Sequence, residues 1–257
     1  MMKQAIFAAV LCTGLLLLSG CAKAQPDAPK AELQTGYLDS SDLTETETVT
    51  QSVIGNFEMA DENAEEPVSV LTRYSSPDGE TFTFDKAGRL CSYSSGKATG
   101  AVAFTESLKA EDVLRATCDE VLSSYISDYA EYTEITSQYY ESDSVTYNLA
   151  MEHKIADGIQ DYALIRLNEA GEVHDISISY ADLDGDCTDK DFITDADKAD
   201  FEKQRTPYMT ALEDYSCEVT YTQYKHAGGK LYAFYELTYT DQTTGLESGT
   251  KRLVFVK

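Results

Sequence analysis

Apolar and polar side chains alternate over three separate blocks of the chain, which is the pattern of half-buried β-strands. Within the first block the alternation is interrupted by Pro77-Asp78-Gly79 and Lys86-Ala87-Gly88, residue types that favour tight turns. The three blocks together predict strands at residues 68–74, 80–85 and 89–93, then at 131–139, 144–154, 160–168 and 172–180, and finally at 216–226, 230–240 and 249–256.

Helical periodicity replaces the alternation between the first two blocks. One apolar stripe with a period near 3.6 residues consists of Leu114, Cys118, Val121, Leu122 and Tyr125. Glu111 and Asp112 precede it, where acidic side chains interact favourably with the positive end of a helix dipole. A helix is therefore predicted to begin near residue 111.

A second helical region is expected before the last three strands. Thr194 or Asp195 can cap its start. Pro207 predicts a break, after which Thr206 would serve as the N-cap of a second short helix.

The order βββ-α-ββββ-α-βββ predicts an α+β fold, in which antiparallel β-meanders pack with two helical segments. We expect an α+β domain over residues 67–180. Residues 181–257 would then form a second helix-plus-three-strand unit or belong to the same domain.

The N-terminus has the pattern of a secretory signal peptide covering residues 1–20. Lys3 precedes a largely apolar run over residues 5–18. As a helix this run is about 21 Å long, too short to span a hydrocarbon core of about 30 Å. The alternative is an uncleaved membrane anchor.

Leu18-Ser19-Gly20-Cys21 resembles the lipobox of bacterial lipoproteins. The resemblance implies that Cys21 is diacylated and becomes the mature N-terminus, since the two acyl chains together give stable anchoring. It places the protein on the outward face of a bacterial cell membrane, attached through diacylglyceryl-Cys21.

Composition predicts an acidic, mostly disordered tether over residues 21–66. Residues 22–69 hold eleven acidic residues against Lys23 and Lys30, and a high net charge with low hydrophobicity opposes folding. For the second half of this stretch another interpretation competes, because residues 44–50 alternate and could form an edge strand.

The first helix and the hairpins on either side of it resemble those of PepSY-type domains. The similar segments are residues 108–114, 162–167 and 169–173, and residues 80–93 repeat the hairpin form. The resemblance covers about residues 67–180, although Lys109 and Val113 depart from the usual pattern. It implies a non-catalytic domain that binds or restrains peptidases or modulates the local environment, and it transfers no catalytic residue.

The negative net charge of the chain excludes some classes of binding partner. With 20 Lys and Arg against 45 Asp and Glu, the formal net charge is −25, which argues against nucleic acid or an anionic lipid surface as partner. Three scattered histidines disfavour an imidazole-based metal site. The sequence contains no G-x-S-x-G, H-E-x-x-H, C-x-x-C or Walker A motif.

One acidic loop resembles the first half of an EF-hand. Asp182, Asp184, Asp186 and Thr188 match the pattern D-x-D-x-D-x-T, and carboxylate oxygens at such positions are ligands that Ca²⁺ prefers. Cys187 replaces the glycine that makes the turn and Ile193 replaces the bidentate glutamate. The loop is therefore either a non-EF calcium site or a solvated acidic loop.

Four cysteines remain after Cys12 and Cys21 are assigned to the leader and the lipid anchor. An exported protein can form disulfides, and we rank Cys187–Cys217 above other pairings, such as Cys91–Cys118. The competing interpretation is that all four are separate reduced thiols.

The tyrosine content also permits two interpretations. Tyrosines that alternate with Thr and Ser suit half-buried strands, but exposed ones could bind a glycan or peptide. The residues concerned are Tyr132, Tyr139, Tyr140, Tyr147, Tyr221 and Tyr224.

The sequence favours a lipid-anchored, non-catalytic binding or regulatory module whose partner is an unknown envelope protein or peptide. The alternatives are an envelope hydrolase with paired carboxylates, or a lipoprotein that binds calcium or another solute.

Overall fold

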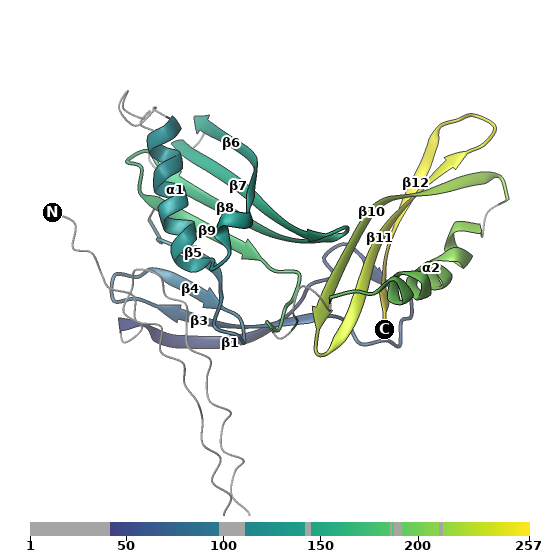
Figure 1. Cartoon of the computed structure of the whole chain (residues 1–257), viewed down its shortest axis with the longest axis horizontal. Helices are drawn as coiled ribbons and strands as arrows, with labels where there is room; N and C mark the ends of the chain where they lie inside the picture. Colours follow the sequence, from purple (N-terminus) through teal and green to yellow (C-terminus); the bar gives the residue numbers. More distant parts are fainter. Residues whose placement is uncertain (1–41, 98–110, 142–144, 186, 188–191, 211–212) are drawn as a thin grey trace, which may run out of the picture. The chain divides into compact units, whose positions relative to one another are not determined.

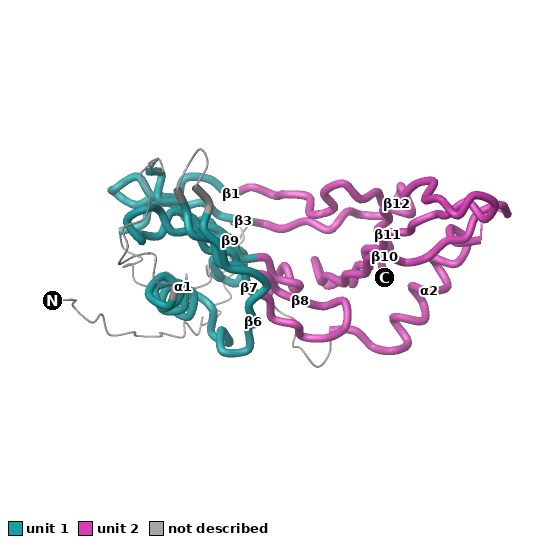
Figure 2. The backbone as a smooth tube through the Cα atoms, turned by 90° about the horizontal axis from the view of Figure 1, so that it is seen from above, with its two compact units in different colours: residues 1–48, 71–151, 163–178 teal, residues 49–70, 152–162, 179–257 magenta. Residues whose placement is uncertain are grey.

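The computed structural model describes residues 42–97, 111–141, 145–185, 187, 192–210 and 213–257. It is an α+β structure with two α-helices and two largely antiparallel sheets (Figure 1), as the predicted order of elements indicated. The chain divides into two compact units (Figure 2).

Unit 1 contains residues up to 48 together with 71–151 and 163–178. Most of it is an eight-stranded sheet with the order β1-β3-β4-β5-β9-β8-β7-β6. The strands are β1 (Thr44–Ser52), β3 (Val68–Ser75), β4 (Thr81–Phe84), β5 (Leu90–Ser94), β6 (Thr133–Glu141), β7 (Val145–Ala156), β8 (Ile159–Asn168) and β9 (Val173–Ser179).

The first predicted meander is confirmed as β3–β4–β5. Phe82 lies opposite Tyr74 on one side and Tyr93 on the other, and Phe82 and Phe84 are buried. Strand β5 also pairs with β9, where Tyr93 faces Ile176. The first meander and the later hairpin therefore share one sheet.

Helix α1 (Glu111–Tyr125) buries the predicted stripe. Leu114, Cys118 and Leu122 are at most 1% exposed, because they recur on one side of the helix. The guanidinium of Arg115 reaches Met151 Sδ on β7 at 3.8 Å. A short 3-10 helix (Tyr129–Glu131) leads on to β6.

The predicted tether is wrong for residues 44–59, which contain β1 and β2 (Glu58–Met59). The competing interpretation of an edge strand is confirmed, because β1 lies at the edge of the sheet next to β3. All nine residues of β1 are exposed, so its charged side chains stay in water while Thr and Val favour an extended backbone. Residues 21–41 lie outside the described residues.

Unit 2 contains residues 49–70, 152–162 and 179–257. The predicted domain boundary at residue 180 thus lies next to the start of its longest segment, but unit 2 also takes two earlier segments. Its sheet has the order β10-β11-β12-β2. The long strands are β10 (Tyr215–Ala227), β11 (Lys230–Asp241) and β12 (Glu247–Val256).

Both faces of the four-stranded sheet carry apolar clusters. Helix α2 (Asp195–Thr210) contributes Phe201 to the larger cluster, with Tyr235, Leu237 and Phe255 from the sheet. On the other face, the segment before and within β2 packs on Tyr232, Phe234 and Val254. The partly buried residues of that segment are Val53, Ile54, Phe57 and Met59.

The predicted break of the second helix at Pro207 is wrong, because α2 continues through this residue to Thr210. Thr206 does not act as an N-cap; its Oγ1 donates back to the carbonyl of Glu202 at 2.7 Å. Proline removes one backbone donor, yet only three residues of the helix follow it. The contacts of Tyr208, described below, hold this last turn in place.

Candidate functional site

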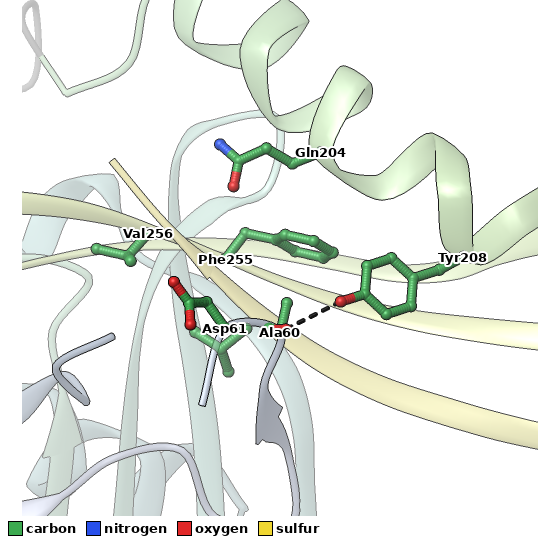
Figure 3. Close-up of a pocket in the computed structure, with 7 residues that line it drawn as sticks. Ala60, Asp61, Gln204, Tyr208, Phe255 and Val256 are labelled. Carbon is green, nitrogen blue, oxygen red and sulfur yellow. Dashed lines mark hydrogen bonds between the residues drawn. The ribbon is translucent and has the colours of Figure 1, made fainter. Parts of the chain in front are cut away.

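A pocket of about 270 Å³ opens in unit 2 between α2, the end of β12 and the residues after β2 (Figure 3). Its lining residues are Ala60, Asp61, Gln204, Tyr208, Val254, Phe255 and Val256. The volume is just below the range of about 300–1,000 Å³ that is typical of drug-sized ligands. The pocket therefore suits one amino-acid side chain or a molecule of similar size.

A capping box fixes the start of the helix that forms one wall. Thr194 Oγ1 accepts the backbone N–H of Asp197 at 3.2 Å, and Asp197 Oδ2 accepts the backbone N–H of Thr194 at 2.9 Å. This reciprocal pair satisfies donors that a helix start leaves open. Of the two predicted caps, Thr194 is confirmed.

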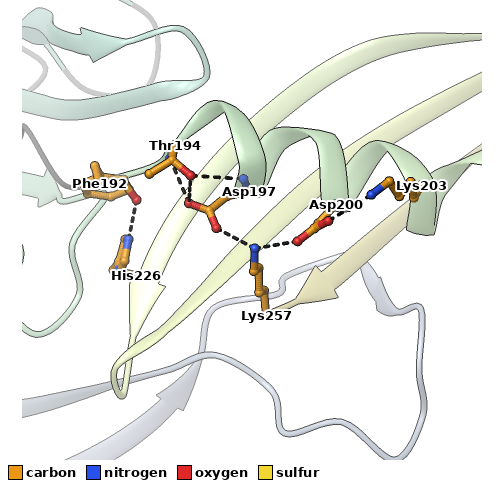
Figure 4. Close-up of polar contacts among 7 residues, drawn as sticks. All are labelled: Phe192, Thr194, Asp197, Asp200, Lys203, His226 and Lys257. Atoms are coloured by element: carbon orange, nitrogen blue, oxygen red, sulfur yellow. Dashed lines mark hydrogen bonds and ion pairs between the residues drawn. The ribbon is translucent and has the colours of Figure 1, made fainter.

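Lys257 attaches the same helix to the end of β12. Its Nζ donates to Asp197 Oδ1 and Asp200 Oδ2, both at 2.7 Å (Figure 4). The bonds from Lys257 and then Thr194 lower the pKa of Asp197 to about 2, and Lys257 likewise lowers the pKa of Asp200. A general acid in glycoside hydrolysis needs a raised pKa, so this acidic pair is unsuited to that role.

Aromatic side chains form the apolar part of the pocket. Tyr208 meets Phe255 edge to face, with ring centroids 5.6 Å apart and an interplanar angle of 80°. The Tyr208 hydroxyl donates to the carbonyl of Ala60 at 2.9 Å. Lys251 Nζ lies 5.0 Å from the centroid of the Tyr208 ring, within cation–π range. Together these contacts hold both rings in one orientation.

Two polar side chains accompany this apolar surface. Asp61 Oδ1 accepts the backbone N–H of Asn63 at 2.9 Å and its side-chain amide at 3.3 Å. Gln204 on α2 lines the pocket as well, and Figure 3 shows its amide above Phe255 and the Asp61 carboxylate below Phe255 in this view. The pocket thus combines an aromatic wall with a negative charge.

In the predicted acidic loop, aspartate carboxylates accept hydrogen bonds from backbone N–H groups. Asp182 is buried, and its carboxylate accepts the backbone N–H groups of Asp184 at 3.1 Å and Cys187 at 2.7 Å. The carboxylate of Asp184 accepts the backbone N–H of Gly228. Asp186 and Thr188 lie outside the described residues. Among the residues that are described, no three His, Cys, Asp or Glu side chains gather as a metal site, and the calcium site stays a prediction.

The strand β10 anchors this loop at one end. Asp182 forms a parallel bridge with His226, whose Nε2 lies 2.6 Å from the carbonyl oxygen of Phe192 (Figure 4). The ring of Phe192 meets His226 edge to face at 4.6 Å. His226 therefore serves in the packing of the loop against the sheet.

The predicted Cys187–Cys217 disulfide is wrong, because both residues keep their thiols. Cys187 is bonded to Asp182, which pairs with His226 at one end of β10, whereas Cys217 lies near the other end of that strand. Cys217 and His226 are nine residue steps apart along the strand, about 30 Å at 3.3 Å per step. A disulfide requires Cα atoms within about 7 Å. Cys91 and Cys118 are also unlinked.

Unit 1 contains a serine–histidine contact that the sequence analysis missed. Ser95 Oγ lies 3.3 Å from His174 Nδ1, and a carboxylate oxygen of Asp175 lies 3.9 Å from the same ring nitrogen. In a catalytic triad the serine and the carboxylate use opposite ring nitrogens. Ser95 Oγ also accepts the backbone N–H of Lys97, so the contact is a structural one.

Three of the six singled-out tyrosines, Tyr132, Tyr147 and Tyr224, are buried. Tyr139 packs on Tyr147 with ring centroids 5.2 Å apart, and Tyr221 is 37% exposed. The side chain of Tyr140 lies outside the described residues. The interpretation as strand packing accounts for the three buried rings.

Sequence reasoning did not find the pocket. Asp61 and Ala60 fall in the stretch predicted to be a tether, and their partners Gln204 and Tyr208 lie more than 140 residues further along the chain. No short motif signals such a juxtaposition. The alternation in residues 44–50 was the only local indication that folding starts before residue 67.

Comparison with known proteins finds no matching family model, no matching curated protein and no matching solved structure. Within the described part of the chain, no helix is long and apolar enough to cross a membrane. Cys21 and the segment 108–110 of the PepSY-like pattern lie outside the described residues.

Proposed function

We propose that this protein is an outward-facing bacterial lipoprotein, held in the membrane by diacylglyceryl-Cys21, whose folded body is a non-catalytic binding module. The lipobox residues 18–21 support the anchor. The PepSY-like pattern of residues 67–180 supports a binding or regulatory role toward an envelope protein or peptide.

The observation that carries the binding role is the pocket of unit 2. Its walls come from α2, β12 and the residues after β2, and three hydrogen bonds from Tyr208 and Lys257 hold these elements together. Sites built on such fixed elements are preorganised, which lowers the entropic cost of binding. The size of the pocket fits one side chain of a partner.

Site-specific photo-crosslinking in intact cells tests this proposal. Gln204 lines the pocket and is exposed, whereas Glu202 is exposed on the same helix but does not line it. Gln204→p-benzoylphenylalanine is expected to yield a discrete adduct with an envelope protein or peptide, and Glu202→p-benzoylphenylalanine is expected to yield none. Equal adducts from both positions, or none from either, would contradict a binding role for the pocket.

A further inference from the structure

We infer that the pocket of unit 2 receives the cationic side chain of a lysine or arginine in a peptide partner. This inference rests on the proposed binding function and adds the chemical class of the group that is bound. Four observations support it: a carboxylate with an available oxygen, an aromatic wall, an amide acceptor and the negative net charge of the chain.

Asp61 is the only carboxylate among the residues that line the pocket. Both of its bonds to Asn63 use Oδ1, and within the described chain Oδ2 accepts no hydrogen bond. The bonds to Asn63 hold the carboxylate in one orientation. A carboxylate that is already oriented and has one oxygen available is well suited to pair with an ammonium or guanidinium group.

The apolar lining matches the carbon chain that carries such a cation. Phe255, Val254 and Val256 line the pocket beside Asp61, and lysine and arginine bury their methylene groups on apolar surface while the charged end stays with polar partners. The Tyr208 ring adds an aromatic surface that already attracts one cation, Lys251, at 5.0 Å. The side-chain carbonyl oxygen of Gln204 provides a further acceptor, because Gln204 also lines the pocket.

The charged side chains around the pocket nearly cancel, so a preference for a cation rests on the oriented carboxylate of Asp61 and on the charge of the whole chain. Lys257 directly follows the lining residue Val256, but its Nζ is held by both Asp197 and Asp200. These three side chains together carry a net charge of −1 and Asp61 adds another negative charge, but Lys203, paired with Asp200, and Lys251, over the Tyr208 ring, balance both. The formal net charge of the whole chain, −25, attracts cations in the same sense.

Titration with blocked amino acids tests the inference. The probes are the N-acetyl methylamides of lysine and arginine, and the neutral controls of similar shape are those of norleucine and citrulline. Binding is followed through the NMR signals of Phe255 and Val256 in the chain beginning at residue 42. We expect lysine or arginine to bind about tenfold or more tightly than its neutral counterpart, the ratio typical of one charge-assisted hydrogen bond.

Two matched variants test whether the preference for a cation depends on Asp61. Asp61→Asn keeps Oδ1 for the turn with Asn63 and removes only the charge, and it should abolish the preference for the cation. Glu62→Gln removes a neighbouring exposed charge that does not line the pocket and should leave the preference intact.

Equal binding of norleucine and lysine would overturn the cationic assignment while leaving a binding pocket in place. Absence of binding by every probe at millimolar concentration would also overturn it, and the crosslinking experiment would then decide separately whether the pocket binds a partner at all. An unchanged preference in Asp61→Asn would show that the cation is recognised elsewhere.

Discussion

The hydroxyl of Tyr208 donates to the carbonyl oxygen of Ala60 at 2.9 Å, across 148 residues of sequence. This bond joins the last turn of α2 to a segment whose composition resembles a disordered linker. The folded body therefore begins before residue 67, and the segment that follows β1 is part of unit 2.

Removal of residues 42–66 is expected to destabilise the protein. A chain beginning at residue 67 lacks β1, β2 and the partly buried Phe57, which packs on Phe234 with ring centroids 5.4 Å apart. We expect the free energy of unfolding to fall by about 3 kcal/mol or more, because several apolar side chains lose their contacts. Urea denaturation of chains beginning at residues 22, 42 and 67 measures this. Equal stability of the last two would refute the role of the segment.

The Asp197–Lys257 pair predicts a dependence of stability on pH. The pKa of Asp197 is about 2 in the folded chain and about 3.9 when unfolded. Because the folded pKa is the lower one, the stabilisation is complete above pH 4 and is lost as the pH falls toward 2. After allowance for solvent screening it amounts to about 1 kcal/mol.

The variant Asp197→Asn isolates this contribution, since asparagine keeps an oxygen for the capping box. The variant should be less stable than the wild type at pH 6 and equally stable near pH 2. Asp195→Asn, which changes an exposed acid in the same turn, serves as control. A difference for Asp197→Asn that persists unchanged at pH 2 would rule out the charge as its cause.

Lys225 is buried, at 8% exposed, near the buried carboxylate of Asp161. Burial lowers the pKa of Lys225 and Asp161 opposes that shift. We expect Lys225→Met to destabilise the protein by about 2–3 kcal/mol, because it leaves a buried carboxylate without its countercharge. The double variant Lys225→Met with Asp161→Asn should recover most of this loss. A double-mutant cycle from chemical denaturation gives both values, and purely additive effects would show that the two side chains do not interact.

The thiols of Cys91 and Cys118 are expected to react with iodoacetamide much more slowly in the folded chain than in the unfolded chain. Burial, followed by the nearby Asp85, raises the pKa of Cys91 to about 12, and burial with Asp119 does the same for Cys118. Because the thiolate is the reactive form, neither should react with iodoacetamide at pH 8 in the native protein. Mass spectrometry of the unfolded chain from residue 42 should count four labelled cysteines. Two missing labels would indicate a disulfide.

Cys21→Ser tests the anchor. This variant should lose metabolic labelling with palmitate and should no longer remain with the membrane, since a chain without acyl groups lacks the main source of bilayer affinity. Its circular dichroism should match that of the chain beginning at residue 22. Membrane retention of Cys21→Ser that only detergent releases would place the anchor elsewhere.

Alternation predicted ten strands, and a period of 3.6 predicted the first helix, all close to their observed bounds, because both periods reflect burial on one face. The stripe from Leu114 to Tyr125 is an example. Two predictions from local sequence were wrong, the helix break at Pro207 and the disordered tether around Asp61, because contacts with distant residues determine the structure there. Pro207 lies within a helix that Tyr208 attaches to Ala60, and Asp61 belongs to a pocket whose other walls lie far along the chain. Neither contact has a local signal.

The pairing of Leu253 with Glu58 has a consequence for how the chain folds. These residues are 195 positions apart, so β2 has no strand to pair with until nearly the whole chain is available. Closing so long a loop is entropically unfavourable, and folding slows as such non-local pairings accumulate. Until the C-terminal strands form, the apolar side chains of this segment stay in water, which makes it the part of unit 2 most exposed to premature association: Val53, Ile54, Phe57 and Met59.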